Sequence, residues 1–397
     1  MVQALRNNEK KKVGIAHPRL GRGGSEARAM WVMQALKDDY EVSLITTGEV
    51  DLEGLNKYYG TSLRPHEFHI RQAPLPGFLC NISGAAALRG AFYQRYCLKI
   101  AHEFDVLVSA YNIVDFGVPA IQCIADFSWS EDIRKDLHPI PLGTRGKFHS
   151  NALLRRVYLS VVGSIAKPRQ RNPFAGKDLI LANSKWTAGI IMAKYGKELG
   201  VLYPPVVDWV SDPSIKDREN GFVCIGRIAP EKRIERIIEI LGLVKTRGHD
   251  IHLHIIGSVD DSSYARFIED VCSKERDWIK FEGLCVGMGK MALIRQHRFG
   301  IHGCQGEAFG IAVAEMVKAG CITFVPEKGG QAEIVDHPSL AYDSVEDAVT
   351  KIDSILRDEA KQAELRSHLA SRSKMFSSEI FVKQIRVIVE DFLRARH

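Results

Sequence analysis

Short apolar runs alternate with longer amphipathic segments along almost the whole chain. In the first half, the runs with the apolar character of buried strands are residues 13–16, 42–46, 106–109, 120–124 and 179–182. Between the first two of them, residues 26–37 carry apolar side chains at helical spacing. This alternation predicts parallel sheets with crossover helices, rather than an all-α or all-β fold.

The second half repeats the rhythm. Strands are expected at residues 222–225, 251–256, 279–282, 300–302 and 322–325, with helices at 234–246, 264–274, 288–296 and 311–319. We therefore predict an α/β protein of two similar doubly wound, Rossmann-like domains. Ligands of such sheets bind beyond the carboxyl ends of the strands, and the cleft between the domains is the expected site.

Two consecutive prolines, Pro204 and Pro205, mark the domain boundary, because neither a helix nor a central strand continues through them. We expect an N-terminal domain over residues 1–205 and a C-terminal domain over 206–377. Residues 378–397 are expected to form a last helix that packs back on one of the two domains, with the N-terminal domain as a candidate.

Composition agrees with a globular protein of this size. The 397 residues are 45% hydrophobic and 26% charged, and no run approaches the roughly 18 apolar residues of a membrane-spanning helix. The apolar stretch 13–16 is too short for a signal peptide. We expect a cytoplasmic protein, either free or peripheral at the inner face of the membrane. The eight cysteines lack CxxC or Cys/His metal spacing, which predicts buried free thiols and no structural metal.

A glycine-rich segment, Gly21-Arg22-Gly23-Gly24, follows the first strand and precedes a helix. Gly23 and Gly24 permit close backbone approach to a ligand, and the helix start presents N–H groups to an anion. The segment fits neither the Walker pattern nor a clean GxGxxG. It indicates a donor-binding loop, with a tight structural turn as the alternative.

A second candidate, Gly226 to Lys232, lies between a strand and a helix of the second half. It places Arg227 and Lys232 five residues apart, so that a forked guanidinium and a point-charge ammonium reach toward one crevice. That pair suits a diphosphate, and a solvated loop is the alternative.

The third candidate runs from Gly303 to Met316, again between a strand and a helix. Glu307 precedes the helix and Glu315 lies inside it. Between them, Gly310 and Ile311 open the helix and offer backbone N–H groups to a phosphate, and Phe309 beside them is a further donor-binding candidate. Carboxylates accept hydrogen bonds from sugar and ribose hydroxyls, so the segment describes a nucleotide-sugar site. A helix charge and an exposed amphipathic position are the structural alternatives.

With these motifs the chain resembles retaining glycosyltransferases of the GT-B fold, family four, over essentially its whole length. The order is the glycine segment, Asn183-Ser184, Tyr203-Pro204-Pro205, Gly226-Arg227 with Glu231-Lys232, Glu307-x7-Glu315 and Gly329-Gly330-x-x-Glu333. The resemblance implies a GT-B fold whose two domains face each other across a cleft. The N-terminal domain would bind the acceptor and the C-terminal domain the nucleotide-sugar.

The resemblance also implies roles for single residues. Arg227 and Lys232 would hold the donor diphosphate and stabilise the departing nucleotide, in place of a divalent metal. Glu307 would contact sugar hydroxyls, and Gly310 and Ile311 would contact sugar or phosphate through their backbone. Glu315 would hold the ribose, and the base would lie near Leu284 and Cys285.

One position departs from the family. Many relatives carry a histidine in the loop after the strand at 120–124, and this chain has Asp126 nearby. Asp126 is a candidate catalytic residue that accepts a sugar hydroxyl or orients the nucleophile. An ordinary loop-capping residue is the alternative.

The resemblance implies a retaining and metal-independent reaction, without a cofactor. A hexose would move from a UDP- or GDP-sugar to a hydroxyl of a glycan or lipid-linked acceptor, in polysaccharide or glycolipid biosynthesis. A nucleotide-sugar-binding protein without turnover and a GT-B-fold epimerase are the alternatives.

Positive charge is concentrated in the first half. Residues 1–220 carry 29 Lys and Arg against 22 Asp and Glu, and the segment 145–171 carries seven cations, no acid and many apolar residues. Such a segment binds anionic lipid surfaces, or else packs on its domain with a solvated basic face. Peripheral membrane contact would suit a lipid-linked acceptor. We expect no nucleic-acid partner, because no reading module is present.

Overall fold

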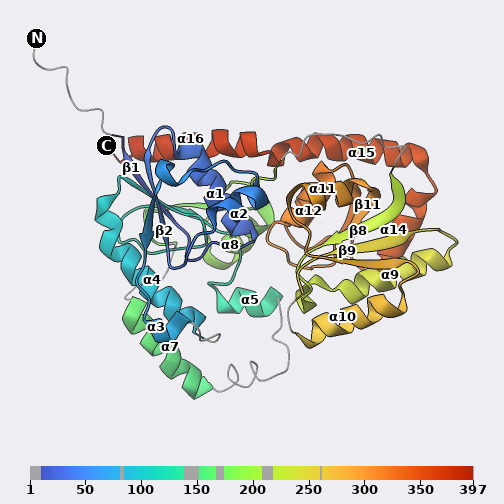
Figure 1. Ribbon diagram of the computed structural model, residues 1–397, viewed down its shortest axis with the longest axis horizontal. Coiled ribbons are helices and arrows are strands. Elements are labelled where there is room, and N and C mark those ends of the chain that lie inside the picture. The colour runs from blue at the N-terminus through green and yellow to red at the C-terminus, as the bar shows by residue number, and fades with distance from the viewer. Residues whose placement is uncertain are drawn as a thin grey trace, which may run out of the picture. The chain divides into compact units, whose positions relative to one another are not determined.

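The computed structural model describes residues 10–80, 85–137, 152–166, 174–207, 218–259 and 262–396. Its contacts divide the chain into two compact units, each built on its own sheet (Figure 1). Unit 1 comprises Met1–Asn183, Ile191–Leu202 and Phe381–His397, and unit 2 comprises Ser184–Ile190 and Tyr203–Ile380.

Unit 1 contains a seven-stranded parallel sheet in the order β3-β2-β1-β4-β5-β6-β7. Its strands are β1 (Lys12–Ala16), β2 (Glu41–Thr46), β3 (His69–Gln72), β4 (Val106–Ser109), β5 (Ile121–Cys123), β6 (Leu179–Ala182) and β7 (Gly200–Val201). Val13 of the central strand lies opposite Val42 and Val106. Because helices cover both faces of such a sheet, its central strands are continuously apolar.

The helices of unit 1 connect these strands on both sides of the sheet. They are α1 (Gly24–Leu36), α2 (Leu52–Tyr59), α3 (Gly77–Cys80), α4 (Ala86–Ile100), α5 (Glu131–Leu137) and α7 (Ala152–Ala166), with the short helices η1 (Pro65–Glu67) and η2 (Ala101–Glu103). The C-terminal helix α16 (Ser378–Arg394) buries Phe381, Ile385 and Val389 in the same core as α1. The last helix of the chain is therefore part of the core of unit 1 from Phe381 onward.

Unit 2 contains a six-stranded parallel sheet in the order β10-β9-β8-β11-β12-β13. Its strands are β8 (Glu219–Ile225), β9 (His252–Ile256), β10 (Ile279–Gly283), β11 (His297–Ile301), β12 (Ile322–Pro326) and β13 (Ala341–Tyr342). Its helices are α9 (Ile234–Thr246), α10 (Ser263–Lys274), α11 (Gly287–Arg295), α12 (Ile311–Lys318), α13 (Gln331–Val335), α14 (Val345–Leu356) and α15 (Glu359–Ser373), with η4 (Pro230–Lys232) and η5 (Lys374–Phe376). Helix α8 (Lys185–Tyr195) begins in unit 2 and ends in unit 1.

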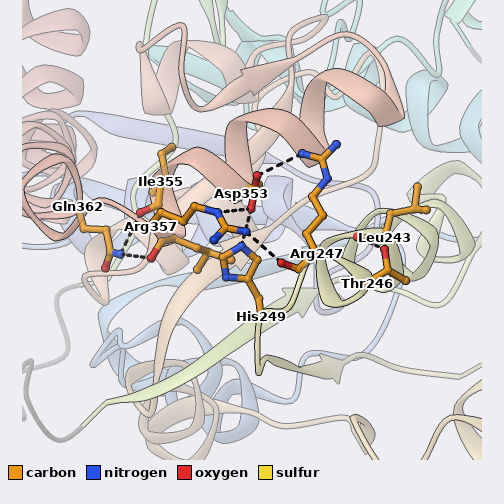
Figure 2. Close-up of polar contacts among 9 residues, drawn as sticks. Leu243, Thr246, Arg247, His249, Asp353, Ile355, Arg357 and Gln362 are labelled. Carbon is orange, nitrogen blue, oxygen red and sulfur yellow. Dashed lines mark hydrogen bonds and ion pairs between the residues drawn. The ribbon is translucent and has the colours of Figure 1, made fainter.

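Polar contacts fasten the end of α9 to α14 (Figure 2). Asp353 accepts hydrogen bonds from Arg357 and Arg247, and one of its oxygens lies 2.6 Å from Nε2 of His249. Arg357 also donates to the Arg247 carbonyl at 3.0 Å. These contacts hold the loop between α9 and β9 against α14, close to the amino end of β9.

The predicted α/β class of two doubly wound domains is confirmed. Each strand expected between residues 13 and 325 is present, with ends that differ by a few residues. Strands β3, β7 and β13 had no counterpart in the prediction, because β3 is exposed along its whole length and the other two have two residues each.

Two further expectations concern the state of the cysteines and the presence of membrane-spanning helices. The seven cysteines whose side chains the structure describes are free thiols, and all except Cys285 are buried. Among the helices of the described residues, none combines the length and apolar character needed to cross a membrane.

Candidate functional site

The carboxyl ends of β8 and β9 approach each other closely at two glycines of unit 2. The Gly226 amide donates to the Ile256 carbonyl at 3.0 Å. A Cβ added to Gly257 would lie 1.9 Å from the Gly226 carbonyl oxygen, so no larger residue fits at position 257. This approach fixes the backbone from which Arg227 and Lys232 extend.

Lys232 and Glu307 form the central ion pair of this edge. Nζ of Lys232 lies 2.5 Å from Oε2 of Glu307, although the two residues are 75 positions apart. Nε2 of His302, which directly follows β11, lies 3.5 Å from the same carboxylate oxygen. The side chains of Lys232 and Glu307 are only 20% and 24% exposed. The predicted diphosphate ligand Lys232 and the predicted sugar ligand Glu307 thus meet directly.

The ionisation of this cluster follows from its burial and its charges. Burial by itself would raise the pKa of Glu307, but the Lys232 ammonium and His302 hold that pKa well below its ordinary value. Burial would likewise lower the pKa of Lys232, and the Glu307 carboxylate raises it instead. Burial lowers the pKa of His302. At neutral pH the site therefore holds an ammonium, a carboxylate and a neutral imidazole.

The loop that carries Glu307 is held by a second loop around Gly330. The Gly330 amide donates to the Glu307 carbonyl at 2.7 Å, and the Gly306 amide donates to the Lys328 carbonyl at 2.8 Å. Nε2 of the buried Gln331 donates to the Cys304 and Pro326 carbonyls. A Cβ at Gly330 would lie 2.3 Å from the Ala308 carbonyl oxygen. Two loops in tight contact therefore set the position of the Glu307 carboxylate.

Helix α12 begins directly after this loop. Gly310 precedes it with a φ of 102°, a left-handed conformation that favours glycine, and Ile311 is its first residue. The first turn of a helix has N–H groups without partners inside the helix, which suit an anion. The ring of Phe309 is buried against Tyr203 and Phe376 and supports the loop, and its contact with the donor stays a prediction.

Glu315 extends from α12 and contacts Lys290 of α11. Nζ of Lys290 lies 2.6 Å from Oε1 of Glu315, and the two side chains are 8% and 17% exposed. The sequence reasoning did not identify Lys290, because nothing adjacent in the chain connects it with Glu315. Lys290 therefore fixes the position of the Glu315 carboxylate.

The remaining predicted donor residues surround the same edge. Arg227 donates to Glu231 at 2.8 Å, and its side chain is 70% exposed. Leu284 and Cys285 follow β10 and precede α11, with Leu284 51% exposed. Unit 2 thus brings Gly226, Arg227, Lys232, Leu284 and Cys285 to the carboxyl edge of one sheet, together with the segment 307–315.

The glycine segment of unit 1 is closed by a tyrosine. The Gly23 amide donates to the Tyr59 hydroxyl at 2.7 Å, and that hydroxyl lies within 3.0 Å of the Gly21 and Gly23 carbonyls. Gly23 precedes α1 and Gly24 is its first residue. Tyr59 is a second residue that sequence reasoning missed, and it gives the segment a fixed turn at a helix start.

Asp126 belongs to a hydrogen-bonded loop of unit 1. Its Oδ1 accepts from Nδ2 of Asn112 at 2.7 Å and from the Ser128 amide at 2.8 Å. Oδ1 of Asn112 in turn accepts the amides of Ala125 and Asp126. Oδ1 of Asp126 is therefore a loop-capping group, and its proposed action on the sugar stays a prediction.

The basic segment 145–171 lies mostly outside the described residues. Helix α7 covers its central part, where Arg156 is exposed and Val161 is 48% exposed. Residues 145–151 and 167–171, with most of the cations, are not among those described.

The fold and the cluster at the carboxyl edge of the second sheet define an α/β protein of the GT-B type. Residues 208–374 match the model of the family described as glycosyl transferases group 1. This match agrees with the resemblance to glycosyltransferases of the GT-B fold that the motifs indicated.

Several curated relatives carry the same name, "GDP-Man:Man(3)GlcNAc(2)-PP-Dol alpha-1,2-mannosyltransferase". The protein from Eremothecium gossypii is 29% identical over 175 residues, 40% of this chain and 30% of that protein. The human protein is 24% identical over 439 residues, 94% of this chain and 86% of that protein. The matches to the Eremothecium, Dictyostelium and Candida relatives span about a third to a half of those proteins.

Among solved structures, the chain resembles Anabaena Alr3699/HepE in complex with UDP and glucose. The TM-score is 0.66 at 15% identity, over 96% of this chain and 100% of that one. This likeness supports the fold.

Proposed function

We propose that this protein is a retaining, metal-independent glycosyltransferase that moves a hexose from a nucleotide-sugar to a hydroxyl of a lipid-linked glycan. The observation that carries the proposal is the contact of Lys232 with Glu307 at 2.5 Å, beside the start of α12. The carboxyl edge of this sheet combines a cation, a carboxylate and the start of a helix. This combination suits a ligand that carries both phosphates and hydroxyls.

GDP-mannose is the donor we propose. The support comes from the names of the relatives, which give GDP-Man as their donor. The HepE complex contains UDP, but a likeness at this identity concerns the fold and leaves the base open. UDP-sugars are therefore the comparison in the test below.

In the proposed reaction the diphosphate leaves while Lys232 and Arg227 neutralise the charge that develops on its oxygens. The side chain of Arg227 is 70% exposed, so it would be able to exchange Glu231 for a phosphate. Because Lys232 contacts Glu307, a sugar hydroxyl bound to the Glu307 carboxylate would lie close to the departing phosphate, which Lys232 would bind. Glu315, fixed by Lys290, would accept the ribose hydroxyls.

The acceptor hydroxyl would attack from the face that the phosphate leaves. The leaving phosphate oxygen would take its proton, so no strong protein base is needed, and the anomeric configuration would be kept. A lipid-linked glycan as acceptor is supported by the names of the relatives, which give Man(3)GlcNAc(2)-PP-Dol. The basic excess of residues 1–220 agrees with an acidic acceptor.

The test is release of nucleotide from a panel of GDP-mannose, UDP-glucose and UDP-N-acetylglucosamine, with and without a lipid-linked glycan. We expect turnover with GDP-mannose. Lys232→Met and Glu307→Gln should lower kcat by about 100- to 1,000-fold, the usual loss for one group that stabilises a developing charge. Added Mg²⁺ or Mn²⁺ should leave the rate unchanged, and NMR of the product should show the donor's anomeric configuration.

Two matched control variants are available in the same unit. Lys274, which pairs with Asp270, and Glu364, which pairs with Lys361, are 71% and 61% exposed. Lys274→Met and Glu364→Gln should keep the wild-type rate. Tight donor binding without release under any acceptor would contradict the proposal in favour of a binding protein. Conversion of the sugar with its nucleotide retained would favour an epimerase.

A further inference from the structure

Three histidines and a glutamate gather on three neighbouring strands of unit 2, toward their amino ends. Glu219 begins β8, His252 begins β9 with His254 two residues later, and His297 begins β11. In the register, His252 lies opposite Gly221, and His297 lies opposite Glu219. Because residues two apart in a strand share a face, all four side chains lie on one face of the sheet.

Their distances are those of a ligand set. One candidate ligand atom from each of the four residues lies within 4.8 Å of the others. Nε2 of His252 is 3.0 Å from Oε2 of Glu219. The ring centres of His254 and His297 are 4.4 Å apart. Ligands at about 2.0–2.2 Å from a tetrahedral ion are separated by about 3.3–3.6 Å, so side-chain shifts of about an ångström complete the set.

One fully buried nitrogen of this cluster lacks a partner. His297 is fully buried, and its Nδ1 lies 2.8 Å from the Leu293 carbonyl, so Nδ1 donates and Nε2 carries a lone pair. In the part of the chain that the structure describes, Nε2 of His297 has no hydrogen-bond partner, whereas Nε2 of His252 has the Glu219 oxygen 3.0 Å away without forming a well-aligned hydrogen bond. A buried acceptor without a partner is rare in native proteins, and a bound ion is one explanation.

The imidazole rings of His254 and His297 are oriented by acceptors on their Nδ1 atoms, as the rings of metal-bound histidines usually are. Nδ1 of His254 lies 2.8 Å from the Glu282 carboxylate, and Nδ1 of His297 contacts a backbone carbonyl. A carboxylate or carbonyl on the far nitrogen is the usual outer partner of a metal-bound histidine. Gly221 makes room for the ring of His252, because a Cβ there would lie 2.2 Å from Nε2.

We propose that Glu219, His252, His254 and His297 bind a divalent transition-metal ion, with zinc as the ion that best suits three imidazoles and one carboxylate in a four-coordinate set. The cluster lies toward the amino ends of strands whose carboxyl ends carry Gly226 and His302. The ion therefore joins β9, β8 and β11 and stabilises unit 2, while the donor edge is left to Lys232 and Glu307. The proposal does not depend on the proposed transferase activity.

The test uses the full chain without a histidine tag, treated with a chelator and then titrated with Zn²⁺ alone. Elemental analysis after gel filtration should give one zinc per chain. The melting temperature should rise with the logarithm of the Zn²⁺ concentration, since an ion that binds only the folded state stabilises it in that way. His252→Gln and Glu219→Gln, on partly exposed side chains, should fold and lose both effects. Glu282→Gln should weaken Zn²⁺ binding by about 10- to 100-fold.

A matched control is His69→Gln in unit 1. His69 lies 3.9 Å from Glu41 on an exposed strand and belongs to neither candidate metal cluster among the described residues, so this variant should bind Zn²⁺ as the wild type does. A second group, His302, Cys304 and Glu307, also has metal-ligand spacing. Co²⁺ distinguishes the two, because a thiolate ligand adds an intense sulfur charge-transfer band that imidazole and carboxylate ligands lack.

Two results would overturn the proposal. One is a chain that takes up no Zn²⁺, which would leave water as the partner of the buried nitrogen. The other is Zn²⁺ uptake that persists in His252→Gln and vanishes in Cys304→Ser, with a sulfur band for Co²⁺. Uptake that is lost in His252→Gln, retained in Cys304→Ser and free of that band supports it.

Discussion

The contact between Lys232 and Glu307 makes a prediction about stability that needs no substrate. In Glu307→Gln the Lys232 ammonium keeps its buried position but loses its counter-charge, and Lys232→Met leaves the carboxylate beside a neutral His302. Breaking a buried ion pair costs about 3–5 kcal/mol. Because these side chains are 20% and 24% exposed, we expect about 2–4 kcal/mol for each variant. The double variant should lose less than the sum, since neither charge is then left alone.

Hydrogen exchange followed by mass spectrometry measures this loss within unit 2. A loss of about 2–4 kcal/mol corresponds to exchange about 30- to 900-fold faster in the most protected peptides of β11 and β12. Peptides of β1 and β4 serve as the internal control, because they belong to unit 1. Unchanged exchange in β11 and β12 for both single variants would refute the argument that this pair is buried and coupled.

The difference in stability between the wild type and these variants should decrease in acid. The folded-state pKa of Glu307 is depressed, so its contribution is present above the unfolded value of about 4.3 and is lost as the pH falls through the folded value. The pKa of Lys232 is raised, so its contribution is complete below about 10.4 and is lost only at higher pH. The difference between wild type and variants should therefore be constant from about pH 5 to 10 and shrink in acid.

Three further changes test the surroundings of the site. Lys290→Met should raise KM for the donor about tenfold with little change in kcat, since Lys290 positions Glu315 and does not touch the reacting atoms; initial rates over a donor series measure both. Tyr59→Phe should lower the free energy of unfolding by about 1–3 kcal/mol, because the amide and carbonyls of the glycine segment lose their hydrogen bonds with the hydroxyl. A melting temperature equal to that of the wild type would contradict this prediction. Gly257→Ala should abolish soluble expression, whereas Gly242→Ala, with open space in α9, should express normally and melt slightly higher.

The sequence predicted those parts of the fold whose signal is local. The strands β1, β4 and β8 were found because burial on both faces makes them continuously apolar. Strand β3 was missed because an exposed edge needs no apolar residues, and all four of its residues are exposed. Helix α14 was missed although its buried residues recur at helical spacing, so a signal of the kind that predicts α1 was present there.

The candidate site was predictable as a set of charges, but its contacts were not. Lys232 and Glu307 stood out because each follows a strand and precedes a helix. Lys290 and Tyr59 did not, since each acts on a group 25 or more positions away. Gly257 was missed for the same reason, because its requirement for glycine comes from the Gly226 carbonyl on the neighbouring strand.

Two carboxylates of the family motifs show why motif membership leaves the role of a residue open. Glu333 follows a glycine pair, just as Glu307 follows Gly306. The oxygens of Glu333, however, accept hydrogen bonds from the amides of Lys185 and Trp186 and from the hydroxyl of Tyr203. Glu333 therefore caps the start of α8 and stabilises the fold. Glu307 contacts the neutral imidazole of His302 and the Lys232 ammonium, and a ligand can compete for the charge of that ammonium. Whether a carboxylate stabilises the fold or is available to a ligand therefore depends on the partner that folding brings to it. That partner lies 75 positions away in the sequence for Glu307 and 147 positions away for Glu333.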